Sequence, residues 1–152
     1  MSIPSITLPV VEALLGNFRN ASLNDLSATP NEVITLIDVF VVLWPVARPL
    51  VEAKGTSKID EIVTALQPAG RASYSDAMSA VTAMRTEMVA LAAVPQAQWH
   101  NRKIAAHGLS VLRVIHLLGD AHLPPVPFDA LVAPFLPALA PMLTAPRTST
   151  KE

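Results

Sequence analysis

One apolar stretch constrains the fold of this chain more than any other feature. Residues 33–51 read VITLIDVFVVLWPVARPLV, and Asp38 and Arg48 are their only charged side chains. The uninterrupted apolar part is shorter than the ~20 residues that cross a bilayer, so a buried helix is favoured over a transmembrane span. Because residues 33–43 carry apolar side chains on nearly every side, we expect other helices to surround this one.

The beginning of this helix is marked in the sequence. Thr29-Pro30-Asn31-Glu32 has the pattern of a capping box, with a hydroxyl N-cap, proline at N1 and glutamate at N3. We therefore expect a helix over about residues 30–53 that stops before Gly55. Pro45 and Pro49 each remove one backbone hydrogen bond and should bend its second half.

Helical periodicity recurs along the chain, whereas strand patterns are scarce. The sequence predicts an all-α, single-domain bundle of five to six helices, with the 30–53 helix at its centre and a proline-containing helix at its C-terminal end. We assign residues 1–146 to this domain and residues 147–152 to a flexible polar tail. The other helices are expected near residues 9–19, 57–67, 73–93, 95–118 and 128–143, with a loop over 20–28 and an extended connection over 122–127.

The C-terminal segment has its large apolar residues at helical spacing. On a helical wheel these residues fill one side, and Pro134, Pro137 and Pro141 fall on the opposite side. Interior prolines cost about 3 kcal/mol each in an isolated helix, so this helix should exist only when docked. We predict an interface with its own bundle or with a neighbouring molecule at Phe128, Leu131, Phe135, Leu139 and Met142.

Composition limits the classes of function. Apolar residues make up 51% of the chain and charged residues only 15%, so we expect part of the surface to be covered by other molecules. The net charge of −1 does not favour attraction to nucleic acid, and the lack of cysteine removes disulfides and thiolate ligands. The N-terminal residues do not resemble a signal peptide, which favours an intracellular location or an assembled particle.

The four histidines all lie within residues 100–122. Their spacings of seven, nine and six residues do not match the three or four that bring two ligands of one helix to one metal ion. His100 and His107 share a face but lie roughly 10.5 Å apart along the axis. We expect no metal and no other cofactor, and interpret His107 and His116 as side chains at the edge of the apolar face. His100 and His107 are candidates for a pH-sensitive seam.

Basic residues accompany these histidines. Arg102, Lys103 and Arg113 form a basic strip that could contact an anion, but no aromatic residues interleave with them, so nucleic-acid binding is not favoured. Ion pairs with acidic neighbours such as Glu87 are the alternative. Ser110 and His107 suggest a catalytic set with Asp120 or Asp129, yet no nucleophile elbow or phosphate-binding glycine loop is present. We therefore predict that the chain is not an enzyme.

Two functional hypotheses remain. The first is a non-enzymatic structural or assembly subunit that self-associates or docks on partner proteins through apolar helix surface, as a coat, shell, filament or adaptor component, and we expect a homo-oligomer or a larger protein assembly. The second is a bundle that binds an apolar small molecule or lipid between its helices. The side chains expected to line such a site are Phe40, Trp44, Met78, Met84 and Met88. A small enzyme or a protein that contacts nucleic acid is the third alternative.

Overall fold

The computed structural model of the protein describes residues 4–24, 26–66 and 76–144, and every regular element within them is helical. Five helices come first: α1 (Leu8–Asn24), α2 (Pro30–Glu52), α3 (Thr56–Leu66), α4 (Ala77–Ala92) and α5 (Asn101–Leu117), with a 3₁₀ turn η1 (Gln96–Gln98) before α5 and a π-helical turn η2 (Leu118–His122) after it. The chain ends in α6 (Pro125–Val132), η3 (Ala133–Phe135) and α7 (Leu136–Thr144). These three follow one another without a break, and we call them the C-terminal arm. With the arm counted once, the described residues form a bundle of six helices and no strand, which confirms the predicted fold class.

The capping box at the start of α2 forms as predicted. The Glu32 amide donates to Thr29 Oγ1 at 3.1 Å, and the Thr29 amide donates to Glu32 Oε1 at 2.9 Å. The helix then continues through Pro45 and Pro49 to Glu52. Gly55 follows with a φ of 120°, a backbone conformation that only glycine adopts without strain. The sequence therefore located both ends of α2 because each end depends on local backbone chemistry.

The position of α2 is central, but the helix is not enclosed. It packs against α3, α4, α5 and the C-terminal arm, and ten of its residues are buried. Its outward side in the second half remains exposed, with Val41, Val42, Val46 and Leu50 between 37% and 44% accessible. The prediction that α2 is surrounded was therefore wrong for this side, because its neighbours pack only on the side that carries Leu36, Phe40 and Leu43.

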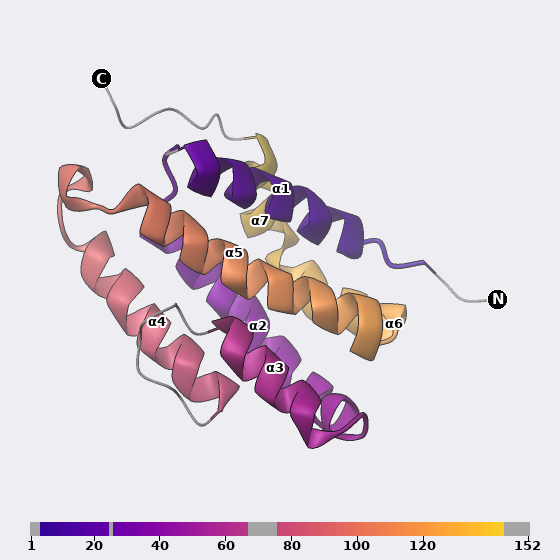
Figure 1. Ribbon diagram of the computed structural model, residues 1–152. Coiled ribbons are helices and arrows are strands. Elements are labelled where there is room, and N and C mark those ends of the chain that lie inside the picture. The colour runs from indigo at the N-terminus through magenta and orange to yellow at the C-terminus, as the bar shows by residue number, and fades with distance from the viewer. Residues whose placement is uncertain (1–3, 25, 67–75, 145–152) are drawn as a thin grey trace.

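Two antiparallel pairs organise the bundle (Figure 1). In α1 and α5, Phe18 lies against Gly108 while Glu12 faces His116, so the two helices run in opposite directions. In α2 and α4, Asp38 pairs with Arg85, and Arg48 acts electrostatically on Asp76 at the start of α4. In Figure 1, α5 and α3 lie toward the viewer and α2 lies behind them.

Several helix ends differ from the predictions. Helix α1 continues to Asn24 instead of giving way to a loop, because Ala21 still packs in the core. Gly119 does not end α5; the chain widens into η2 there, and an added Cβ at Gly119 would meet the Phe128 ring at 2.7 Å. The predicted extended connection over 122–127 shrinks to Leu123 and Pro124, since α6 begins at Pro125. The predicted start of α4 at residues 73–75 and the tail at 147–152 lie outside the described residues.

The C-terminal arm has the orientation predicted for its prolines. Pro134, Pro137 and Pro141 are exposed, whereas Phe128 and Leu139 are buried on the opposite side. Asn17 of α1 reinforces this docking, because its side-chain amide donates to the Met142 carbonyl at 3.1 Å. The arm is thus a bent helical segment held by its apolar side.

The close approach of α1 and α5 yields a test of the fold. A Cβ added at Gly108 would overlap the ring of the buried Phe18, so Gly108→Ala should lower the free energy of unfolding by about 1–3 kcal/mol. Gly16 has nothing within 4 Å of its added Cβ, so Gly16→Ala should raise the stability by about 0.5–1 kcal/mol through helix propensity. Urea denaturation of both variants measures the difference, and equal effects would contradict the packing of Phe18 on Gly108.

Candidate functional site

An acidic residue of α4 reaches two basic residues of α5. Glu87 forms an ion pair with Lys103, and its second carboxylate oxygen lies 3.5 Å from Nε2 of His107. Lys103 and His107 are one helical turn apart, so a single carboxylate can contact both. His107 is buried, with 4% of its surface accessible, as expected for a histidine at the edge of the apolar face. This cluster links α4 to α5.

The basic strip predicted on α5 does not converge on one point. Lys103 turns toward Glu87, while Arg102 and Arg113 remain exposed. Arg102 and Arg113 are eleven residues apart, which places them roughly 16 Å apart along the helix axis. His100 lies before the helix as an exposed N-cap residue. The structure therefore separates His100 from His107 and spreads the predicted anion contacts over three turns.

The residues considered for catalysis or metal binding are engaged elsewhere. Ser110 Oγ donates to the Ala106 carbonyl of its own helix at 3.0 Å. Asp129 accepts hydrogen bonds from the N-terminal segment instead of facing His107. In residues 4–24, 26–66 and 76–144, no group of three or more His, Asp or Glu side chains could hold a metal ion. Ser110, His107 and Asp129 therefore do not form a Ser-His-Asp set.

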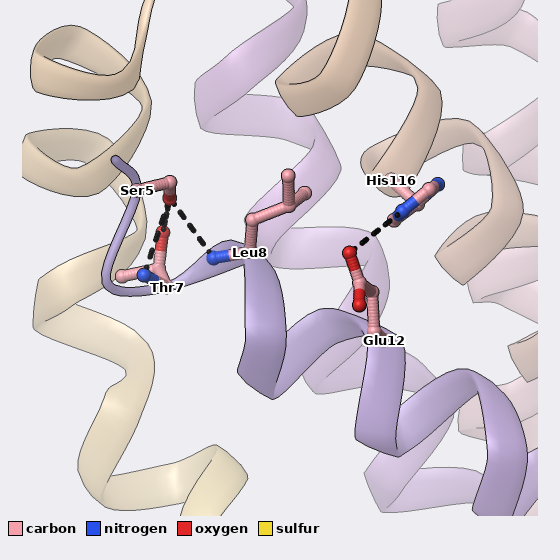
Figure 2. Close-up of polar contacts among 5 residues, drawn as sticks. All are labelled: Ser5, Thr7, Leu8, Glu12 and His116. Carbon is pink, nitrogen blue, oxygen red and sulfur yellow. Dashed lines mark hydrogen bonds and ion pairs between the residues drawn. The ribbon is translucent and has the colours of Figure 1, made fainter. Parts of the chain in front are cut away.

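The most developed polar cluster, which we call the Asp129 clamp, joins α6 to the segment before α1. Asp129 Oδ1 accepts hydrogen bonds from Ser5 Oγ and Thr7 Oγ1, both at 2.6 Å, and from the Thr7 amide at 3.2 Å. Asp129 Oδ2 accepts one from the Ile6 amide at 3.0 Å. Ser5 Oγ in turn accepts from the Leu8 amide at 3.0 Å, as Figure 2 shows. The clamp therefore fixes the start of α1 and holds the C-terminal arm at once.

The clamp favours the ionised form of Asp129. Burial alone would raise the pKa of this carboxyl, but the hydrogen bonds from Ser5, Thr7 and Ile6 outweigh burial and hold the pKa below its ordinary value of 3.8. Sequence reasoning missed Ser5 and Thr7, because more than 120 residues separate them from Asp129. Only a local signal existed: a serine three residues before the first helical residue, Leu8.

Two further histidines lie at the far end of α5. His116 Nε2 is 3.4 Å from Glu12 Oε1 of α1, on a partly exposed seam (Figure 2). Burial lowers the pKa of His122, and the nearby cations of Lys54 and Lys58 lower it further. The Nδ1 atom of His122 is buried without a hydrogen-bond partner in the described part of the chain. Burial and the two lysines therefore both favour the neutral imidazole of His122.

The five residues predicted as an interface lie on the inward side of the arm. Three of them, Phe128, Leu139 and Met142, are buried in the core of the protein, and Leu131 and Phe135 pack against it half-buried. In this conformation these side chains contact their own bundle, so the three buried ones can reach a second molecule only if the arm leaves it.

The apolar side chains that do face outward lie on α2. Six residues at positions i, i+1, i+4, i+5, i+8 and i+9 form one exposed surface, which we call the α2 stripe: Val41, Val42, Pro45, Val46, Pro49 and Leu50. Pro45 and Pro49 have no amide hydrogen, so the carbonyls of Val41 and Pro45 lack their usual helical donors on this side. The Asp38–Arg85 and Arg48–Glu52 ion pairs flank the stripe.

Four of the five side chains expected to line a ligand site belong to the buried core, and Met78 packs against that core partly buried. Phe40 and Trp44 stack with ring centroids 5.6 Å apart, and both are buried together with Met84 and Met88. An open groove of about 240 Å³ lies elsewhere, between the start of α2 and α7. Its lining consists of Asn31, Glu32, Thr35, Ala138, Pro141 and Met142, none of which was expected to contact a ligand.

Three helical stretches of the described chain are long and apolar enough to cross a membrane, judged by length and composition. They are Pro30–Glu52, Asn101–His122 and Pro125–Thr144. Comparisons with protein-family models, with curated proteins and with solved structures found no match to this chain.

The clamp makes a testable contribution to stability. Because folding lowers the pKa of Asp129, the ionised clamp stabilises the fold above the unfolded pKa, and this contribution is lost as the pH falls through the folded pKa. Asp129→Asn should therefore lower the free energy of unfolding by about 1–2 kcal/mol at neutral pH, as expected for charge-assisted hydrogen bonds. The difference from wild type should shrink below pH 3.8.

Urea denaturation over a pH series measures this difference, and hydrogen exchange of the Ile6 and Thr7 amides reports on the clamp directly. Asp120→Asn is the matched control, because Asp120 is exposed and carries the same charge. Its effect on stability should stay within about 0.5 kcal/mol. Equal losses in the two variants would show that the clamp contributes nothing specific.

Proposed function

We propose that this protein is a non-enzymatic assembly subunit that pairs with a second copy of itself through the α2 stripe. The observation that carries the proposal is an unbroken apolar surface along the outward side of the central helix. Four of its side chains, Val41, Val42, Val46 and Leu50, are each more than a third exposed. Large apolar patches of this kind on soluble proteins mark interaction sites.

The arrangement of charge around the α2 stripe supports a protein partner. Asp38–Arg85 and Arg48–Glu52 are neutral pairs at its edges, so an apolar centre lies inside a polar rim, as in protein interfaces. The described aromatic residues that commonly anchor a protein at a membrane surface are not part of the stripe, since Trp44 is buried and Trp99 donates to the Leu91 carbonyl of α4. A net charge of −1 opposes pairing of identical copies very little.

Pairing of two copies is favoured because the side chains of the α2 stripe are valine, proline and leucine, which need no specific polar partner. Two such helix faces can pack about a two-fold axis, which is the commonest symmetry of soluble oligomers. The stripe has fewer residues than the roughly 20–30 per side of a standard interface, so we expect a weak, concentration-dependent dimer.

A charge placed within the α2 stripe tests the proposal. Val46→Glu would have to bury a carboxylate in the dimer, so it should weaken association by at least about tenfold, or ~1.4 kcal/mol. Sedimentation equilibrium over a wide concentration range measures the dissociation constant of each protein. Circular dichroism shows whether the variant keeps its fold, which it should because Val46 is 44% exposed.

Val89→Glu is the matched control, because Val89 of α4 is 48% exposed but lies outside the α2 stripe. It should dimerise like the wild type. A wild-type protein that stays monomeric at every concentration would refute the proposal. Equal weakening by both substitutions would mean that a different surface is responsible.

A further inference from the structure

A single ionisable residue interrupts the C-terminal arm. Residues 125–144 read PVPFDALVAPFLPALAPMLT, and Asp129 is the only acidic or basic side chain among them. This same residue forms the clamp, with four hydrogen bonds from Ser5, Ile6 and Thr7. The one charge of the arm is therefore also its strongest polar attachment to the rest of the protein.

The arm is apolar on its outward side as well as its inward side. Phe128, Val132 and Leu139 are buried against the bundle. Up to Thr144 at its end, the exposed residues of the arm are only valine, alanine and proline: Val126, Ala130, Ala133, Pro134, Pro137, Ala138, Ala140 and Pro141. The docked position buries only 22% of the apolar window of the arm. Water thus contacts most of a segment that has almost no polar side chain.

We infer that the C-terminal arm is a detachable lipid-binding segment and that Asp129 is the latch that keeps it on the bundle. A helix of 20 residues is about 30 Å long, which matches the hydrocarbon thickness of a bilayer. A protein groove would cover one side of the arm, whereas lipid covers every side of a helix that is apolar all round. Prolines are tolerated in such helices more readily than in soluble ones.

The negative charge of Asp129 favours the docked arm over the inserted arm in two ways. The ionised carboxylate holds Ser5 and Thr7, which favours the docked arm, and a charge within the hydrocarbon disfavours the inserted arm. Neutralising Asp129 weakens the first effect and removes the second. Among the described residues, the Asn17 amide also attaches α7 by donating to the Met142 and Leu143 carbonyls, and the arm is connected to η2 through Leu123 and Pro124.

The charged groups near Asp129 do not determine the pKa of its carboxyl. The charged and titratable side chains of the elements around it are Glu12 and Arg19 of α1, Glu32, Asp38, Arg48 and Glu52 of α2, Arg102, Lys103, His107, Arg113 and His116 of α5, Asp120 and His122 of η2, and Lys54 beside η2. None of them shifts the pKa of Asp129, which responds to burial and to the hydrogen bonds of Ser5, Ile6 and Thr7. Because those hydrogen bonds lower the pKa, acid should open the latch only below pH 3.8.

Flotation of the full chain with neutral phosphatidylcholine vesicles at neutral pH tests the inference. Asp129→Asn should raise the vesicle-bound fraction at least about tenfold over wild type, because the charge no longer opposes insertion. Asp120→Asn, which changes the same charge outside the arm, should float no more than wild type. A cysteine placed at Ala140 of this cysteine-free chain and labelled with an environment-sensitive dye should show a blue shift on vesicle binding.

A second substitution separates insertion from loss of folding. Ala133 is exposed in the middle of the arm, so Ala133→Lys returns a charge there without altering the core. It should abolish vesicle binding in the Asp129→Asn background at neutral pH, where lysine is charged. The inference would be overturned if the protein with both Asp129→Asn and Ala133→Lys still bound vesicles. It would also be overturned if the Asp129→Asn protein bound vesicles without a blue shift of the dye at position 140.

Two other results would also overturn it. One is an Asp129→Asn protein that stays with the wild type in the aqueous fraction. The other is an Asp129→Asn protein that forms larger oligomers and does not bind vesicles. In that case the released arm would dock on other copies of the chain instead of on lipid. Neither result depends on the α2 stripe, since Val46→Glu can be added to remove self-association through that surface.

Discussion

Packing of the inward side of α2 is the interaction on which the rest of this structure depends. Leu36, Phe40 and Leu43 are fully buried there, and the Phe40 ring stacks on Trp44. Burial of side chains of this size stabilises a fold by about 1.5–3 kcal/mol each, so these contacts outweigh any exposed ion pair of the molecule. The same packing decides what remains outside, because a helix apolar on both sides can turn only one of them to its own core.

Polar side chains are few, and the structure uses them at the boundaries between helices. Glu87 joins α4 to α5, Asp38 joins α2 to α4, and Asp129 joins the arm to the start of α1. Of these three residues, Asp129 holds the densest set of hydrogen bonds, with short contacts to two hydroxyl groups. Hydrogen bonds to an ionised group are stronger than those between neutral groups. Asp129 therefore contributes more to the docking of the arm than one exposed charge would.

The two outward apolar surfaces differ in shape, and this difference sets the kind of partner that each one fits. The α2 stripe is one side of a helix whose other side is already buried, and it lies between neutral ion pairs. The arm is apolar around its whole circumference and is attached through few polar contacts. A one-sided surface suits another protein, while an all-round apolar segment suits a protein core or lipid.

Sequence alone determined the helical class, the capped start of α2, the outward prolines of the arm and the buried position of His107. These features follow from local backbone chemistry or from the periodicity of one helix, which neighbours in the chain specify. Tertiary structure decided the rest: Ser5 and Thr7 meet Asp129 across more than 120 residues, and the Phe128 ring packs so close to Gly119 that no Cβ would fit there. It also decided that Phe128, Leu139 and Met142 turn inward while Val42 and Val46 stay in water. A helical wheel shows that a side is apolar, but only the packing of the whole bundle selects which apolar sides are covered.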